Sequence, residues 1–160
     1  MKIALVIASD RSFRGERDDL TGPLVIEYLK KDKNEVFYQI IPDEKDIIKQ
    51  TLLDFVGKNV NLILTSGGTG FAKRDVTPEA TKEVIEKEAP GIAEYMRAEN
   101  AKNSKNSFLS RGICGIKNET LIINLPGSPN GALECYKIVE PLLNHAIQLL
   151  TNSIKDCKMA

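Results

Sequence analysis

Apolar runs of strand length alternate with amphipathic stretches of helix length along this chain. The run at 2–9 is apolar almost throughout, which is typical of a strand at the centre of a parallel sheet. The runs at 34–41 and 59–66 predict a second and a third strand. The stretch 113–127 holds the turn sequence KNET between two apolar runs, so it predicts a pair of strands of which one runs antiparallel.

Helical periodicity fills the segments between these strands. The predicted helices cover 23–32, 42–57, 76–91, 91–101 and 130–154. In the second of them one face carries Ile47, Ile48, Leu52, Phe55 and Val56. Thr21 or Gly22 is expected near the cap of the first helix, and Thr77 is expected to cap the third, with Pro78 in its first turn. Pro141 predicts a kink in the last helix, or two helices end to end.

This alternation predicts an α/β fold, a three-layer α-β-α domain on a mostly parallel sheet with one antiparallel strand. The length of 160 residues, without repeats or linkers, indicates a single domain over 1–160. Sheets of this kind bind ligands beyond the carboxyl ends of their strands. Three features are expected to meet there: Asp10, the glycine loop at 67–70, and the sequence NLPGSPN at 124–130.

Composition excludes several classes of partner. The 22 basic residues balance the 22 acidic ones, so no overall field attracts nucleic acid or an anionic membrane. The chain has no tryptophan and few aromatic residues, which argues against a base-stacking platform. No apolar run approaches the length of a membrane span, and the first run is too short for a signal peptide. We therefore expect a cytoplasmic protein that binds neither nucleic acid nor membranes.

The three cysteines form no metal-binding pattern. Their odd number and their spacing indicate a reducing compartment without a disulfide framework. Cys114 and Cys135 lie in apolar segments and are expected to be small core residues, whereas Cys157 belongs to a tail, 155–160, that is expected to fray. The only histidine, His145, falls on a helical pattern, which favours a helix-face residue over a catalytic base.

The sequence TSGGTGFAKRDVTPEAT, residues 65–81, carries the strongest chemical signal. Gly67, Gly68 and Gly70 leave the main-chain amides free to converge on one ligand. The helix that follows adds an N-terminus, which favours anions. The loop has neither the Gly-Lys-Ser/Thr of a Walker loop nor a GxGxxG pattern. A tight turn alone needs one glycine, so three in four residues predict a bound phosphate and hence a phosphorylated small molecule.

Two aspartates adjoin this loop, each with two interpretations. Asp43 either caps the helix that it opens or belongs to the site, and Asp75 either supports the next helix N-terminus or faces the same cleft. If their strands are close, both carboxylates face one cleft. Two carboxylates beside bound phosphates are a usual setting for Mg²⁺.

Other polar side chains on these loops also have two interpretations. Ser128 and Asn130, which follow the flexible Gly127, either cap a helix or donate to a ligand. Arg11 either clamps a phosphate or lies in solvent, and Lys73 and Arg74 either add positive charge to the cleft or point into solvent. The residues alone therefore predict the site but leave its substrate open.

Taken together, TSGGTGFAKRDVTPEAT, IPDE, LIINLPGSPNGALE and IASDRS resemble the MogA/MoaB family of molybdenum-cofactor biosynthesis, which includes the G domains of gephyrin and its plant counterpart. The resemblance covers nearly the whole chain, and the motifs occur in the family's order. GGTG alone also fits related molybdopterin-binding domains and the competence-damage family, whereas RDVTPEAT is more specific. Some MoaB-like members depart from RDVTPEA, but this chain keeps it.

The resemblance implies a molybdopterin adenylyltransferase. In that family the terminal phosphate of molybdopterin attacks the α-phosphate of ATP, pyrophosphate leaves, and Mg²⁺ is required. The family's two functional aspartates match Asp43 and Asp75, which would hold Mg²⁺. The implied substrate-binding residues are Asp10, Ser66, Gly67, Gly68, Thr69, Gly70, Thr77, Pro126, Gly127 and Ser128.

The resemblance also implies a homotrimer that hands its product to a molybdate-inserting partner protein. Two other functions remain open at this point. The first is a carrier of the same fold that binds molybdopterin without adenylylating it. The second is an enzyme that acts on another nucleotide, as in the competence-damage family, and that needs no pterin.

Overall fold

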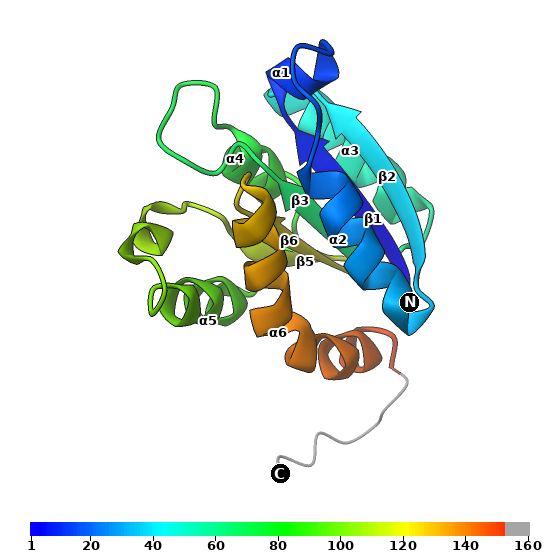
Figure 1. Ribbon diagram of the computed structural model, residues 1–160. Helices are drawn as coiled ribbons and strands as arrows, with labels where there is room; N and C mark the ends of the chain where they lie inside the picture. The colour runs from blue at the N-terminus through cyan, green and yellow to red at the C-terminus, as the bar shows by residue number, and fades with distance from the viewer. Residues whose placement is uncertain (153–160) are drawn as a thin grey trace.

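Six strands form one mixed sheet in the computed structural model, which describes residues 1–152 (Figure 1). The strands are β1 (Lys2–Ala8), β2 (Glu35–Ile41), β3 (Leu62–Ser66), β4 (Lys87–Glu88), β5 (Cys114–Lys117) and β6 (Thr120–Leu125), and their order is β2-β1-β3-β6-β5-β4. β2, β1, β3 and β6 are mutually parallel, and β5 is antiparallel to both of its neighbours. The predicted strands and the mostly parallel sheet are confirmed. The prediction of a frayed tail falls outside the described residues.

Helices cover both faces of this sheet, as the three-layer prediction requires. They are α1 (Asp10–Phe13), α2 (Thr21–Leu29), α3 (Lys45–Gly57), α4 (Thr77–Lys82), α5 (Pro90–Asn100) and α6 (Pro129–Leu150), with 3₁₀ turns η1 (Lys30–Asp32) and η2 (Lys105–Leu109). α2, α5 and α6 pack on one face, and α3 and α4 pack on the other (Figure 1). Among residues 1–152, no helix is both long and apolar enough to cross a membrane.

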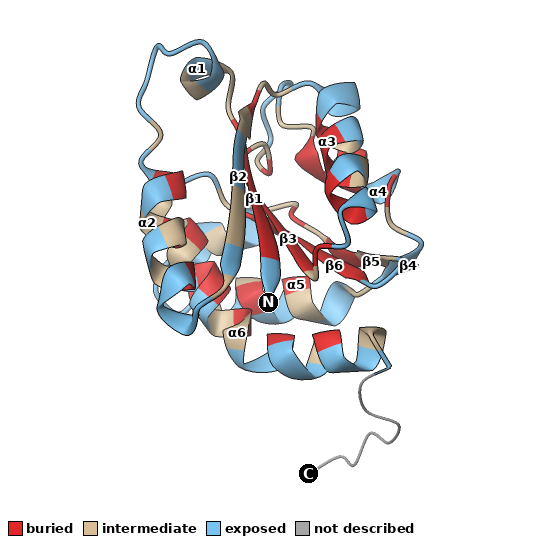
Figure 2. Ribbon diagram, turned by 90° about the vertical axis from the view of Figure 1, so that its right-hand side faces the viewer, coloured by how far each residue is buried: buried red, intermediate tan, exposed pale blue. Residues whose placement is uncertain are grey.

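The core lies on both faces of the central strands because successive side chains of a strand point to opposite sides. Ile3, Leu5 and Ile7 of β1 pack under α2 and α6, whereas Ala4 and Val6 face α3. Figure 2 shows these strands buried and the outer faces of the helices exposed. Cys114 and Cys135 are buried, as predicted, in the part of the core between the sheet and α2, α5 and α6. The buried sheet is therefore a rigid platform for the loops at its edge.

The prediction of one helix over 76–91 is wrong in its second half. α4 ends at Lys82, and the chain then forms the short edge strand β4. The amides of Glu86 and Ala89 donate to the carbonyls of Ile116 and Cys114, at 2.7 and 2.9 Å. These bonds satisfy the free edge of β5, which outweighs the helical propensity of the segment. The chain between β1 and α2, for which no helix was predicted, contains the short helix α1.

The predicted caps and faces need two corrections. Thr21 and Gly22 do lie next to the N-cap residue Leu20, as expected, and the carboxylate of Asp19 accepts hydrogen bonds from both of their amides, each at 2.9 Å. Thr77 is the first residue of α4 and makes no side-chain cap bond. Ile47 is 43% exposed, although the other apolar residues predicted for that face of α3 are buried.

The last helix is continuous through its proline. α6 runs from Pro129 to Leu150 with Pro141 inside it, so the alternative of two separate helices is wrong. Figure 1 shows the helix changing direction along its length, in keeping with the predicted kink. Proline lacks an amide donor and crowds the carbonyl four residues earlier, which is a common cause of such bends.

Candidate functional site

The loops that follow four parallel strands meet at one edge of the sheet. β2 lies on one side of β1 and β3 lies on the other, so the loops after β1 and β3 diverge at a topological switch point. Such a point opens a crevice for ligands in α/β sheets. A cavity of about 780 Å³ lies here. The predicted site residues that line it are Asp10, Asp43, Ser66, Gly67, Gly68, Asp75, Gly127 and Ser128.

Two glycines make the turn after β3 possible. Gly67 and Gly68 have φ angles of 104° and 63°, in the left-handed region that favours glycine. A Cβ atom on Gly67 would overlap the carbonyl oxygen of Ala8, and one on Gly68 would overlap the hydroxyl of Thr77. The main chain of Gly127 approaches this turn closely, and Ser66 Oγ donates to the carbonyl of Pro126 at 2.8 Å. The turn and residues 127–129 thus form one wall of the cavity.

Asp43 is held in the cavity by the loop after β1, not by its own helix. Its Oδ2 accepts a hydrogen bond from the amide of Asp10 at 2.9 Å, and the amide of Asp43 donates back to Asp10 Oδ1 at 3.1 Å. Glu44 occupies the N-cap position of α3, so the N-cap interpretation of Asp43 is wrong. Burial raises the pKa of Asp43, and the negative charges of Asp10 and Asp75 raise it further. Such a carboxylate favours a cation beside it.

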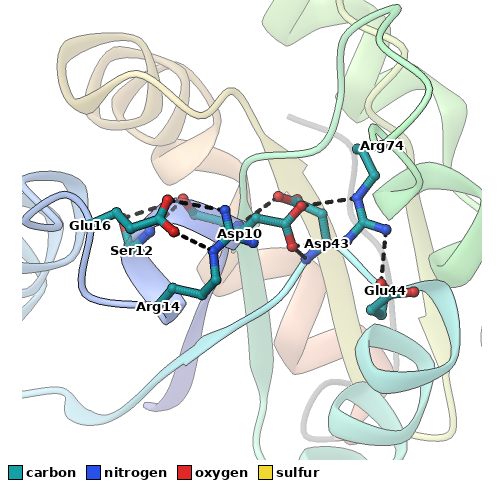
Figure 3. A network of polar contacts seen from close by, with 8 residues as sticks. Asp10, Ser12, Arg14, Glu16, Asp43, Glu44 and Arg74 are labelled. Atoms are coloured by element: carbon teal, nitrogen blue, oxygen red, sulfur yellow. Dashed lines mark hydrogen bonds and ion pairs between the residues drawn. The ribbon is translucent and has the colours of Figure 1, made fainter.

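Arg74 lies between two acidic side chains, Asp10 of the cavity lining and Glu44 at the start of α3 (Figure 3). Its Nε and Nη2 donate to the two carboxylate oxygens of Asp10, both at 2.9 Å, and its Nη1 donates to Glu44 at 2.8 Å. These hydrogen bonds lower the pKa of Asp10 and raise that of Arg74. The structure therefore resolves the alternatives for Arg74, because the side chain lies in the cleft. Arg11, Arg14 and Arg17 also line the cavity.

Four predicted site residues do not line this cavity. Thr69 and Thr77 are buried beneath the turn, and Gly70 has its carbonyl directed at Arg111. Pro126 instead lines a smaller cavity of about 310 Å³, which shares Ser128 with the first one. Thr77 is fully buried, and its hydroxyl has no hydrogen-bond partner within residues 1–152.

Comparison with known proteins decides the family. Residues 4–145 match a family described as a probable molybdopterin binding domain. The chain belongs to this molybdopterin-binding family. The match begins within β1 and covers the other five strands and all four loops of the cavity, so the resemblance seen in the motifs is confirmed.

Several members of the family are closely similar to this chain. The molybdopterin adenylyltransferase of Helicobacter pylori J99 is 40% identical over 152 residues, which cover 92% of this chain and 86% of that protein. The molybdenum cofactor synthesis protein cinnamon of Drosophila melanogaster is 42% identical over 149 residues, 91% of this chain, but this chain spans only 25% of its length. The crystal structure of MoaB from Thermus thermophilus superposes with a TM-score of 0.89 at 44% identity, covering 94% of this chain and 96% of that one.

Two residues that the sequence analysis missed support the site of this molybdopterin-binding protein. Asn124 is buried at the end of β6, and its Nδ2 donates to the hydroxyls of Thr65 and Thr81, both at 2.9 Å. A buried amide inside an apolar strand is a signal that could have been noticed, because such a group requires partners. Arg111 contacts the glycine loop from a segment far along the chain, and no local pattern indicates it.

The raised pKa of Asp43 leads to a prediction about stability. The folded protein holds a proton on Asp43 more tightly than the unfolded chain does. Ionisation of Asp43 therefore destabilises the fold as the pH rises from the pKa of the unfolded chain through the higher pKa of the folded protein. Asp43→Asn removes that charge and can keep an oxygen for the Asp10 amide. We expect the thermal midpoint at pH 7 to rise by about 1–3 °C, and the gain to disappear below the pKa of an unfolded aspartate. Calorimetry at pH 7 and pH 3.5 measures this; an unchanged or lower midpoint at pH 7 would contradict it.

Proposed function

We propose that this protein is a molybdopterin adenylyltransferase, which transfers AMP from ATP to the terminal phosphate of molybdopterin and releases pyrophosphate. The observation that carries the proposal is the meeting of the glycine turn with Asp43 and Asp75 at the switch point of the sheet. A relative that is 40% identical over 92% of this chain bears the name molybdopterin adenylyltransferase. We further propose that residues 1–160 act as one catalytic domain.

The reaction joins two phosphates, so positioning and charge compensation dominate. An oxygen of the terminal phosphate of molybdopterin attacks the α-phosphorus of ATP and forms a P–O bond. The bond from that phosphorus to the bridging oxygen breaks, and pyrophosphate leaves with the electron pair. The amide of Gly67 donates to the carbonyl of Leu125 at 3.4 Å, so the amide of Gly68 is the one that would hold a phosphate. Arg74 and the other arginines of the cavity would compensate the charge of the triphosphate.

No side chain of the protein needs to form a covalent intermediate. Burial raises the pKa of Cys114 to about 12 and that of Cys135 to about 11, so both thiols stay protonated and unreactive. The cavity lining offers carboxylates, arginines, hydroxyls and glycine amides instead. This inventory suits in-line phosphoryl transfer and does not suit acyl transfer through a nucleophile.

The donor set fits Mg²⁺ held between protein and substrate. Oδ1 of Asp43 and the unpartnered hydroxyl of Thr77 both lie against Gly68, in a space that any larger residue would fill. Within residues 1–152, no three acidic, histidine or cysteine side chains converge as a ready-made metal cage. Two carboxylates completed by substrate phosphates and water are the usual way in which Mg²⁺ is bound. When bound, the ion would neutralise the developing charge of pyrophosphate.

We also propose a cytoplasmic homotrimer that passes its product to a molybdate-inserting protein. Support comes from the apolar side chains that the chain leaves exposed around α5 and η2, among which Tyr95, Phe108 and Leu109 are 44%, 64% and 53% exposed. Exposed apolar groups of this size are typical of contact surfaces. Light scattering is expected to give three times the chain mass of 17.7 kDa, and a monomer at micromolar concentration would contradict the trimer.

Product analysis tests the proposed activity. The purified protein is incubated with molybdopterin, ATP and Mg²⁺, and the pterin fraction is examined by mass spectrometry. Adenylyl-molybdopterin in amounts exceeding the enzyme is the expected product, and it should be absent when Mg²⁺ is replaced by a chelator. Unmodified molybdopterin bound in a one-to-one ratio would favour the carrier. Consumption of ATP without pterin would favour an enzyme for another nucleotide.

A further inference from the structure

We infer that Arg111 is a positioning residue, which fixes the loop between Gly70 and Asp75 so that the Asp75 carboxylate stays in the cavity. Arg111 lies just before β5, more than 30 residues away along the chain, and it does not line the cavity. It would therefore act through Asp75 and not by touching the substrate. The inference rests on the proposed function for its catalytic consequence, but its effect on the loop is independent of that function.

One arginine makes four separate attachments to this loop and to the start of α4. The amide of Arg111 donates to the carbonyl of Thr69 at 2.9 Å. Its Nε donates to the carbonyl of Gly70 at 2.7 Å, and its Nη2 donates to the carbonyl of Asp75 at 2.6 Å. Its Nη1 pairs with the carboxylate of Glu79. The guanidinium thus joins the first and the last residue of the loop.

The loop has few other attachments to the body of the protein. Residues 71–74 are exposed, and Phe71 is 72% exposed. Two bonds are internal: the Asp75 amide donates to the Ala72 carbonyl at 2.9 Å, and the Ala72 amide donates to Asp75 Oδ2 at 2.8 Å. Arg74 adds ion pairs with Asp10, which lines the cavity, and with Glu44 at the start of α3. The Arg111 guanidinium is therefore the main anchor of the loop on the side away from the cavity.

The chemistry of the guanidinium explains why arginine occupies this position. Its planar fork presents five donors in fixed directions, so it can satisfy two carbonyls and a carboxylate at once. A lysine ammonium keeps the charge but cannot reach three separated acceptors in that geometry. Reactions that depend on positioning lose about a hundredfold in rate for a displacement of about 1 Å, so a loosened Asp75 should be costly.

The test compares Arg111→Lys with the control Glu79→Gln. The control weakens the ion pair but keeps all three bonds to carbonyl oxygens. For Arg111→Lys we expect kcat for pyrophosphate release to fall by about tenfold or more, and half-saturating Mg²⁺ to rise severalfold, with KM for molybdopterin unchanged. Glu79→Gln is expected to behave as the wild type. A second variant, Arg111→Gln, should match or exceed the effect of Arg111→Lys.

Limited proteolysis measures the mobility of the loop without any substrate. Trypsin can cleave after Lys73 and Arg74, so a loosened loop should be nicked several times faster in Arg111→Lys, at a temperature where both proteins are fully folded. Faster nicking with a loss of kcat supports the inference. If Arg111→Lys is cleaved at the wild-type rate and keeps the wild-type kcat, the inference is wrong. It is also wrong if the variant loses activity only in proportion to the fraction of protein that is unfolded. If the wild type has no transferase activity, the proposed function fails, and the rate of nicking alone decides whether Arg111 fixes the loop.

Discussion

Asp75→Asn is expected to lower kcat for pyrophosphate release by about a hundredfold or more, because it removes one of the two carboxylates proposed to hold Mg²⁺. The substitution is mild for the loop itself. Oδ2 of Asp75 accepts a hydrogen bond from the Ala72 amide at 2.8 Å, and an asparagine oxygen can accept the same bond. The loss of kcat should therefore result from the missing charge and not from a rearranged loop.

Steady-state kinetics beside a pterin-binding titration measure this effect. Asp54→Asn serves as the control, because Asp54 is exposed on α3 and does not line the cavity. We expect wild-type kcat in the control and near-wild-type molybdopterin affinity in both variants. An Asp75→Asn protein with wild-type kcat would mean that Asp75 only supports the start of α4.

Gly67→Ala is expected to cause the largest loss of stability. The residue has a φ of 104°, and a Cβ atom there would overlap the carbonyl oxygen of Ala8 in the main chain of β1. The unfavourable φ costs about 1–2 kcal/mol, and the forced shift of a packed strand adds about 1–3 kcal/mol. The free energy of unfolding should therefore fall by about 3 kcal/mol, which corresponds to a thermal midpoint about 6–12 °C lower.

Gly57→Ala provides the matched comparison. Gly57 ends α3, and a Cβ atom there would meet no neighbouring atom within 4 Å. The same added methyl group should leave the midpoint unchanged or raise it slightly, since alanine favours helix. Denaturant unfolding of the two variants measures the contrast. Equal midpoints would show that the turn after β3 can shift to accept a side chain, and the close approach of the turn to β1 would then not be required.

The central sheet could be predicted from the sequence because its strands are apolar on both faces. The runs that became β1 and β3 have no helical period, and both strands are buried on both sides. β4 could not be predicted in this way. Lys87 and Glu88 carry no strand signal, and they pair with Ile116 and Gly115 only because β5 presents a free edge to them.

The parts of the site that are encoded by short stretches of sequence could be predicted. The loops after β1, β3 and β6 were expected to meet, and Asp43 after β2 was expected to join them only if its strand lay close by; the structure places Asp10, Asp43 and the glycine turn around one cavity. The direction of Arg74 and the role of Arg111 depend on partners 30 or more residues away, which no short motif encodes. For Thr77 a short motif predicted the wrong role. Its position is typical of a helix cap, but its hydroxyl is buried and has no hydrogen-bond partner within residues 1–152.

Pyrophosphate release is the most direct test of the proposed transferase activity. The wild-type protein is assayed with ATP and Mg²⁺, with and without molybdopterin, beside Asp43→Ala and Asp75→Ala. We expect release that requires the pterin and is lost in both variants, because the glycine turn would hold a substrate phosphate next to the two carboxylates. Bound pterin without any release by the wild type would contradict it, and the protein would then be a molybdopterin carrier.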